Sequence, residues 1–171
     1  MSHTDSLEIY TISVLRSGER FLLLERNAAK KLFPSRWSGL GGKVEPHELE
    51  RIRASALREV EEEAGIPAGE IARYSLRRVL LVSRPRQALR LLFYFTGEID
   101  RVEAPPCSEG TLHWVRSEDF ERLDIIETTR PVLALLAADM ARDPEGGELP
   151  RVGLSVFSAA GAFRRIVWED A

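Results

Sequence analysis

Two segments with a helical pattern lie among several short strand-like segments, and this alternation limits the possible folds more than any other feature. The helical segments are residues 49–64 and 131–141. Strands are predicted at residues 7–15, 20–25, 76–83, 88–99, 111–115, 152–157 and 163–168, and a short helix with Ser117 as its N-cap is predicted at 117–120. Two helices bury the apolar surfaces of such a chain only by covering the two faces of one sheet. We therefore predict an α/β fold with a central mixed sheet, in a single domain that spans residues 1–171.

The bulk properties describe an ordinary globular chain. Its 171 residues are enough for a real core, and 44% apolar with 30% charged residues excludes disordered and fibrous classes. A net charge of −3 gives no general attraction to nucleic acid polymers or anionic membranes. No secretory or membrane-spanning segment is recognisable, and the single cysteine, Cys107, allows no internal disulfide. We expect a soluble cytoplasmic protein, monomeric or homodimeric, that binds a small molecule.

The helical segment 49–64 carries three acidic residues on one flank. Glu59, Glu62 and Glu63 are three and four residues apart, so they share one side of a helix, next to the apolar stripe. Repulsion between them favours a divalent cation, because hard cations prefer carboxylate oxygens. The alternative is an ordinary solvated helix face, since helix exteriors are often rich in glutamate.

A glycine pair stands just before this helix, at the end of a long irregular loop, residues 27–42. Gly41 and Gly42 let the backbone pass close to a ligand, and the Gly41 carbonyl would add one more hard oxygen ligand. Metal ions held in this way attract polyphosphate and lower the pKa of bound water. The pattern therefore favours phosphoryl chemistry.

Residues 42–66 resemble the Nudix box, whose family pattern is G-x5-E-x7-R-E-U-x-E-E-x-G-U, with U a bulky aliphatic residue. The second half matches at every defined position: Arg58, Glu59, Val60, Glu62, Glu63, Gly65 and Ile66. The first half contains two extra residues between Pro46 and Arg53. Either Glu48 or Glu50 could therefore be the first glutamate of the box.

The resemblance implies an α/β/α sandwich and a hydrolase of nucleoside diphosphates linked to a further group, dependent on Mg²⁺ or Mn²⁺. Arg58 would orient the glutamates of the box through charge-assisted hydrogen bonds. Glu59, Glu62 or Glu109 would act as the general base, and the residues alone do not choose among them. The metal ligands would be Gly41, Glu59, Glu62, Glu63 and, from a distant loop, Glu109.

Weaker similarity points to the oxidised purine nucleoside triphosphate diphosphatases. It rests on Tyr10-Thr11, on residues 36–44, and on Ser108-Glu109 before Trp114. Basic residues suit a polyphosphate, while Trp37 would either stack on a base or anchor its loop. The substrate-binding candidates are Thr11, Ser38 and Glu127 for the base, Arg26 and Lys43 for the phosphates, and Trp37.

We therefore expect hydrolysis of a (deoxy)nucleoside triphosphate, including one with an oxidised purine base, to the monophosphate and pyrophosphate. Two alternatives stay open. One is a hydrolase of another nucleotide, such as ADP-ribose or a nucleotide sugar. The other is a Nudix-like sensor that binds a nucleotide without turning it over.

Overall fold

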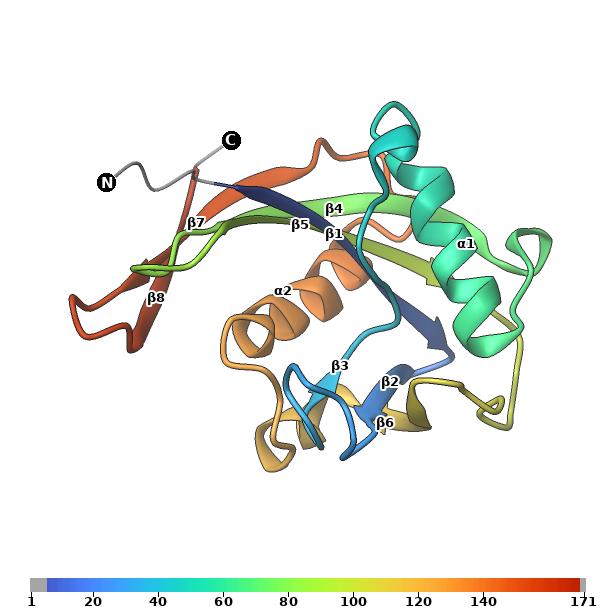
Figure 1. Ribbon diagram of the computed structural model, residues 1–171. Helices are drawn as coiled ribbons and strands as arrows, with labels where there is room; N and C mark the ends of the chain where they lie inside the picture. Colours follow the sequence, from blue (N-terminus) through green and yellow to red (C-terminus); the bar gives the residue numbers. More distant parts are fainter. Residues whose placement is uncertain (1–5, 170–171) are drawn as a thin grey trace.

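The computed structural model describes residues 6–169, which form one eight-stranded sheet with a helix on each side (Figure 1). The two α-helices are α1 (Ile52–Ala64) and α2 (Thr129–Arg142), and three short 3₁₀ helices are η1 (Pro46–Glu48), η2 (Ala68–Glu70) and η3 (Ser117–Arg122). The strands are β1 (Leu7–Ser17), β2 (Arg20–Arg26), β3 (Trp37–Ser38), β4 (Ala72–Val82), β5 (Leu89–Glu98), β6 (Gly110–Arg116), β7 (Arg151–Phe157) and β8 (Phe163–Trp168).

The sheet is mixed, as the sequence predicts. Its strand order is β3-β2-β1-β5-β4-β7-β8, and β6 pairs with β2 outside this path. The pairs β1–β5 and β4–β7 are parallel, while the other pairs are antiparallel. The chain returns between parallel neighbours through long connections that contain the helices, which places one helix on each face.

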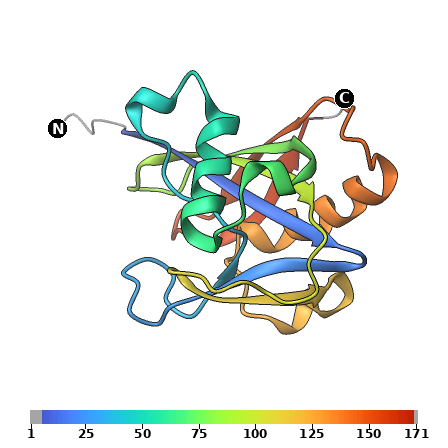
Figure 2. The same cartoon turned by 90° about the vertical axis from the view of Figure 1, so that its right-hand side faces the viewer.

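Each helix buries its apolar stripe against one face of the sheet. α1 contributes Ala56, Val60 and Ala64 to a core with Leu15 and Phe95. The opposite core is formed by α2 with the other face of β1, β4 and β5; the α2 residues in it are Val132, Leu133, Leu136 and Met140. Figure 2 shows α1 crossing in front of β1, with the β2–β6 ribbon below it. The predicted α/β/α sandwich is confirmed.

The strands β1 and β2 separate soon after their turn, and this separation makes room for the glycine pair. They pair only between Leu15–Ser17 and Arg20–Leu22. Further back along β1, the loop before α1 takes the place of β2: the N–H of Thr11 donates to the Gly42 carbonyl at 3.0 Å, and the N–H of Val44 donates to the Ile9 carbonyl at 2.8 Å. The glycines are therefore held between β1 and α1.

Three local predictions differ from the structure. The N-cap of η3 is Arg116 rather than Ser117, and no side chain caps it, because the turn is a short 3₁₀ helix that follows directly on β6. The loop 27–42 contains the two-residue strand β3, which pairs with Leu24 and Glu25. β4 begins at Ala72, and irregular pairing with β5 between Ala72 and Arg78 interrupts the alternation there.

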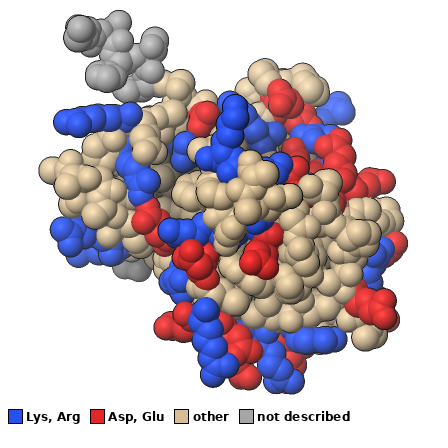
Figure 3. Space-filling model, turned by 60° about the horizontal axis from the view of Figure 1, so that its bottom comes forward, with Lys and Arg blue, Asp and Glu red and all other residues tan. Residues whose placement is uncertain are grey.

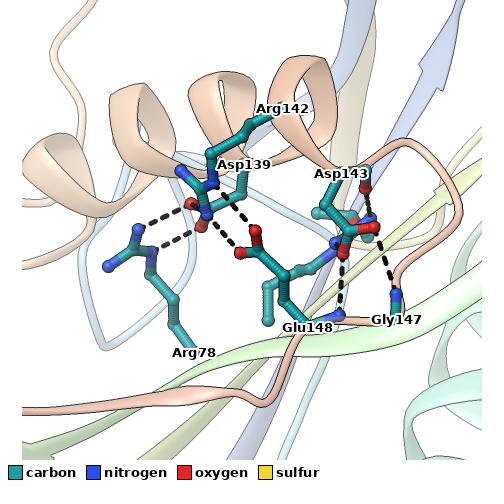
Figure 4. Close-up of polar contacts among 8 residues, drawn as sticks. Arg78, Asp139, Arg142, Asp143, Gly147 and Glu148 are labelled. Carbon is teal, nitrogen blue, oxygen red and sulfur yellow. Dashed lines mark hydrogen bonds and ion pairs between the residues drawn. The ribbon is translucent and has the colours of Figure 1, made fainter. Parts of the chain in front are cut away.

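Buried ion pairs fasten the C-terminal part of the chain to β4 (Figure 4). Asp139 on α2 accepts two hydrogen bonds from Arg78, at 2.7 and 2.8 Å, and a third from Arg142. Arg77, the neighbouring residue on β4, donates to Asp143 at 2.7 Å. Because Arg77 and Arg78 are both buried, these carboxylates supply the charge that the two arginines need.

Candidate active site

The arginine and first glutamate of the Nudix-like stretch form the most highly connected ion pair of the site. Arg58 donates from Nε to Glu48 Oε1 at 2.7 Å and from Nη2 to Glu48 Oε2 at 2.9 Å. Ser55 Oγ and the backbone N–H of Glu45 donate to the same carboxylate. These contacts, led by Arg58, lower the pKa of Glu48 to about 2. Glu48 therefore holds the loop before the helix to α1.

The two extra residues of the box lie in the turn between η1 and α1. η1 ends at Glu48 and α1 starts at Ile52, so the additional length lies at residues 49–51 and leaves the Arg58–Glu48 pair intact. Glu50 is exposed and takes no part in this pair. The structure thus favours Glu48 over Glu50 as the first glutamate of the box.

Arg58 also contacts two of the predicted metal ligands. Its Nη2 lies 2.9 Å from Glu59 Oε1, and its Nη1 donates to Glu62 Oε2 at 2.8 Å. Hydrogen bonding to Glu48, followed by the charge of Glu59, raises the pKa of Arg58, which stays protonated. One guanidinium thus gathers three carboxylates, while most of the Glu62 side chain stays exposed.

The glycine pair packs directly against the other acidic side chains. The N–H of Gly41 donates to Glu63 Oε2 at 2.9 Å. Gly41 has φ +148°, and a Cβ at this position would overlap the carbonyl oxygen of Thr11. A Cβ at Gly42 would lie 2.6 Å from the carboxyl carbon of Glu59. Both positions need glycine because backbone and carboxylates occupy the space that a side chain would take.

Burial shifts the pKa values of two carboxyls on this flank. It raises the pKa of Glu63 to about 7, against the opposing hydrogen bond from Gly41, and the charges of Glu59 and Glu109 act in the same direction as burial. Burial also raises the pKa of Glu59, although Arg58 opposes it. A cation bound nearby would favour the ionised form of both carboxyls.

The predicted distant ligand, Glu109, lies on a loop attached to the end of α1. The N–H of Ser108 donates to the Glu63 carbonyl at 3.1 Å, and the N–H of Asn27 donates to the Glu109 carbonyl at 2.9 Å. The Glu109 side chain forms an ion pair with Lys30. Since the charge of Glu109 raises the pKa of Glu63, the loop brings this carboxylate into electrostatic range of the helix.

The donor set is suited to a hard divalent ion. The buried carboxylate of Glu63 and the partly buried carboxylate of Glu59 share the site with the Gly41 backbone, and all the potential ligands are oxygen atoms, as Mg²⁺ and Mn²⁺ prefer. Within residues 6–169, no group of three Asp, Glu, His or Cys side chains is arranged to hold a metal ion. Glu62 is held by Arg58 and Glu109 by Lys30, so both carboxylates would have to leave these partners to become ligands.

A pocket of about 140 Å³ opens beside Gly41. It is walled by the start of β1, the end of β4, the start of β5, the loop 32–33 and the beginning of α2. Its lining includes four of the predicted site residues: Thr11, Arg26, Ser38 and Gly41. Alternation along β1 directs the Thr11 side chain to the α1 face of the sheet, where its Oγ1 is buried without a hydrogen-bond partner among the described residues.

Three predicted substrate-binding residues lie outside this lining. Trp37 packs its ring against His113, with ring centroids 4.9 Å apart, and its backbone bonds to Asp124 and Ile126, which is the arrangement of a loop anchor. Lys43 is exposed, with Nζ 3.4 Å from Glu8 Oε1. Glu127 forms an ion pair with Arg84.

The sequence analysis missed several residues that line the pocket. They come from elements far apart in the chain, and the most polar of them are Tyr10, Arg90, Thr128 and Thr129. Tyr10 stands beside the predicted Thr11, so its place on the same strand was a usable signal. Nothing in the sequence marks Arg90, because its position depends on the parallel pairing of β5 with β1.

Comparison with known proteins agrees with this geometry. The NUDIX domain family model matches residues 7–136, so the chain belongs to the Nudix family. It is similar to the nucleoside triphosphatase NudI of Klebsiella pneumoniae (strain 342), with 30% identity over 133 residues that cover 71% of this chain and 90% of that protein. The chain is a Nudix hydrolase, a class of enzymes that act on phosphoanhydride bonds of nucleotide-type substrates and generally use divalent metal ions.

Solved structures show the same fold. A MutT protein from Bacillus halodurans superimposes with a TM-score of 0.67 and 16% identity, covering 95% of this chain and 97% of that one. A MutT protein from Methanosarcina mazei Go1 superimposes with a TM-score of 0.62 and 22% identity, covering 84% of this chain and 99% of that one. The E. coli dihydroneopterin triphosphate pyrophosphohydrolase superimposes with a TM-score of 0.62 and 18% identity, covering 77% of this chain and 95% of that one.

No helix in residues 6–169 combines the length and apolar character needed to cross a bilayer. Figure 3, with the lower side of Figure 1 turned forward, shows Lys and Arg interspersed with Asp and Glu on that face.

Proposed function

We propose that the protein hydrolyses a (deoxy)nucleoside triphosphate to the monophosphate and pyrophosphate, with Mg²⁺ or Mn²⁺. The main support is the position of Gly41, which contacts Glu63 of the acidic helix and also lines the adjacent pocket. A nucleotide could therefore place its base in the pocket while its phosphates reach the carboxylates. The nucleoside triphosphatase activity in the name of the Klebsiella relative agrees with this substrate class.

The proposed site residues divide into three roles. Glu59, Glu62, Glu63 and Glu109 would hold the metal together with the Gly41 carbonyl, and Arg58 would orient the helix carboxylates. Arg26, which lines the pocket, would contact the phosphates, as would Lys43. Thr11, Ser38, Trp37 and Glu127 stay proposals for recognition of the base.

The bound metal would neutralise phosphate charge and increase the acidity of water. Water attacks phosphorus at the bridge between the α and β phosphates, the bridging P–O bond breaks, and pyrophosphate leaves. The proton of water passes to a carboxylate, for which Glu59, Glu62 and Glu109 are the candidates.

A panel of nucleotides with Mg²⁺ tests the proposal through release of pyrophosphate. It contains ordinary and oxidised purine triphosphates, pyrimidine triphosphates, ADP-ribose and a nucleotide sugar. Turnover of a triphosphate with pyrophosphate as product supports the proposal. Turnover of ADP-ribose or the nucleotide sugar alone would replace it with another Nudix activity. Thermal stabilisation by nucleotides without any turnover would indicate a sensor.

The remaining proposals concern the state of the protein in the cell. We propose that residues 1–171 act as one Nudix domain, as a monomer or homodimer in the cytoplasm. Small nucleotides would be its ligands, rather than nucleic acid polymers or membranes.

A further inference from the structure

We propose that Arg90 selects nucleotides whose base carries a carbonyl group, at position 6 of a purine or position 4 of a pyrimidine, over nucleotides with an amino group there. This inference rests on the proposed function, since it requires a nucleotide to enter the pocket with its base. It assigns a specificity-determining role to a residue outside the acidic helix.

The strand register directs Arg90 toward the pocket. Arg90 pairs with Glu8 across the parallel β1–β5 ladder, and Tyr10 pairs with Leu92 two residues further on. Tyr10 and Leu92 belong to the core on the α2 face of the sheet, so Arg90 and Glu8, two residues away, point to the same face. Arg90, Tyr10 and Leu92 all line the pocket.

Glu8 binds the guanidinium of Arg90 through its Nε atom only. Arg90 Nε lies 3.1 Å from Glu8 Oε2, and the pKa of Glu8 is lowered chiefly by this hydrogen bond, so the carboxylate stays charged. Glu8 also lies within 3.4 Å of Lys43 Nζ and of the Tyr10 hydroxyl. Neither Nη atom of Arg90 has an acceptor among the described residues. Arg90 is thus fixed in direction and keeps its two terminal donors for a ligand.

The position of Arg90 suits the base end of a nucleotide. The N–H of Thr11 bonds to Gly42, so Gly41 and the acidic helix lie beside Thr11 on β1. Glu8, the partner of Arg90, stands three residues earlier, about 10 Å away along the strand. The pocket wall between Gly41 and Arg90 is apolar or aromatic. It includes Tyr10, Phe33 and Leu92, a surface suited to a flat ring.

The two charged side chains of the pocket lining, Arg26 and Arg90, can only donate, whereas its hydroxyls can both donate and accept. Its lining in the described part of the chain contains two arginines and several hydroxyls, but no Asp, Glu, Asn or Gln side chain. An exocyclic amino group would therefore face the donors of Arg90 with no carboxylate or amide acceptor in the pocket lining, since the Glu8 carboxylate binds Arg90 from outside that lining. A carbonyl oxygen would accept from Arg90 and, in a purine, N7 would accept the second hydrogen bond.

Two pairs of nucleotides that differ at this position test the inference: ITP against ATP, and UTP against CTP. Dissociation constants are measured in Ca²⁺, and kcat/KM in Mg²⁺. We expect the carbonyl member of each pair to be favoured roughly tenfold or more, the discrimination of a well-formed two-donor contact. Ratios within about twofold in the wild-type protein would overturn the inference.

Variants then assign the preference to Arg90. In Arg90→Met the ratio should fall to within about threefold, since the donor pair is lost. Arg90→Lys keeps a charge beside Glu8 but loses the two-pronged geometry, so it should also lose most of the preference. Arg165→Met, at an exposed position on β8, is the matched control and should keep the wild-type ratio. A preference that survives both Arg90 variants would contradict the assignment.

The outcomes separate this inference from the proposed function. Turnover of triphosphates without a preference for carbonyl bases leaves the proposed function in place and removes the role of Arg90. Binding with the expected preference but without turnover supports Arg90 and removes the hydrolase activity on triphosphates.

Discussion

Gly41 donates its backbone N–H to the carboxylate of Glu63, and this contact joins the loop before α1 to the buried side of the acidic helix. Position 41 has no space for a side chain, because a Cβ there would overlap the carbonyl oxygen of Thr11. The partner, Glu63, is buried, with 9% of its surface exposed. The loop and the helix therefore depend on each other, and the contact brings the Gly41 backbone next to the carboxylates proposed to hold the metal.

Glu63→Gln should separate activity from stability. The glutamine side chain can still accept the hydrogen bond from Gly41, and it removes the cost of burying a charge, so the melting temperature in a chelator should not fall. Loss of a metal ligand should lower kcat by at least about a hundredfold. Thermal melting in EDTA and steady-state kinetics in Mg²⁺ check the two parts. Normal turnover in this variant would remove Glu63 from the metal site.

Glu62→Gln should also lower kcat by at least about a hundredfold, because Glu62 is a candidate metal ligand and general base. The neighbouring Glu61 is exposed and belongs to the same turn of α1, so Glu61→Gln is a matched control that should retain wild-type kinetics. Equal effects of the two substitutions would indicate a general loss of acidic charge rather than a specific role.

Gly42→Ala should reduce activity by about tenfold or more, since a new methyl group would displace the Glu59 carboxyl, and a displacement of this size is costly in catalysis. Gly69→Ala, in η2, meets open space and serves as the control. Kinetics and far-UV circular dichroism of both variants distinguish a local change from unfolding. Full activity of Gly42→Ala would show that Glu59 can move without consequence.

Glu48→Gln should destabilise the protein at neutral pH, with a melting temperature lower by a few degrees, roughly the effect of losing one such ion pair. The pKa of Glu48 is about 2 in the folded protein, below its ordinary value of 4.5, so its ionised form stabilises the fold. This contribution is complete above about pH 4.5 and is lost as the pH falls through about 2.

The difference between wild type and Glu48→Gln should therefore shrink as the pH falls from 4.5 toward 2. Denaturant unfolding at several pH values measures it. Glu50→Gln, two residues away at an exposed position, should change stability at none of them. A larger effect at Glu50 than at Glu48 would reverse the assignment of the first glutamate in the box.

Asp139→Ala should be among the most destabilising single changes, by about 3–5 kcal/mol, because it leaves the buried Arg78 without its carboxylate partner. The comparison is Asp119→Ala, which breaks an exposed pair with Arg122 and should cost about 0–1 kcal/mol. Equilibrium unfolding in urea gives both values. Similar costs for the two variants would show that the buried pair has no special importance.

The acidic-helix half of the candidate site could be predicted because it is local in sequence. Arg58, Glu59, Glu62 and Glu63 lie on one helix, so their spacing alone places them together. The alternation of strands and helices likewise gave the mixed sheet and its two covering helices. The choice between Glu48 and Glu50 needed the structure, since it depends on where η1 ends and α1 begins.

The pocket could not be predicted in the same way. Arg90 and Thr128 reach it from distant elements, and their positions depend on strand pairing and on how α2 packs. Apolar periodicity shows which face of a strand is buried but does not show which strand lies beside it. Trp37 illustrates a related difficulty, because a tryptophan that stacks on a ligand and one that anchors a loop look alike in a sequence.

The Arg58–Glu48 pair connects two residues across space, so the turn between η1 and α1 can change in length without disturbing it. A motif defined by a fixed number of intervening residues would reject this chain, although the second half of its Nudix box is complete. Treating that turn as a variable spacer would allow a search to recover such enzymes. The same turn is also a natural position for inserting a tag or a reporter peptide in engineered forms of the enzyme.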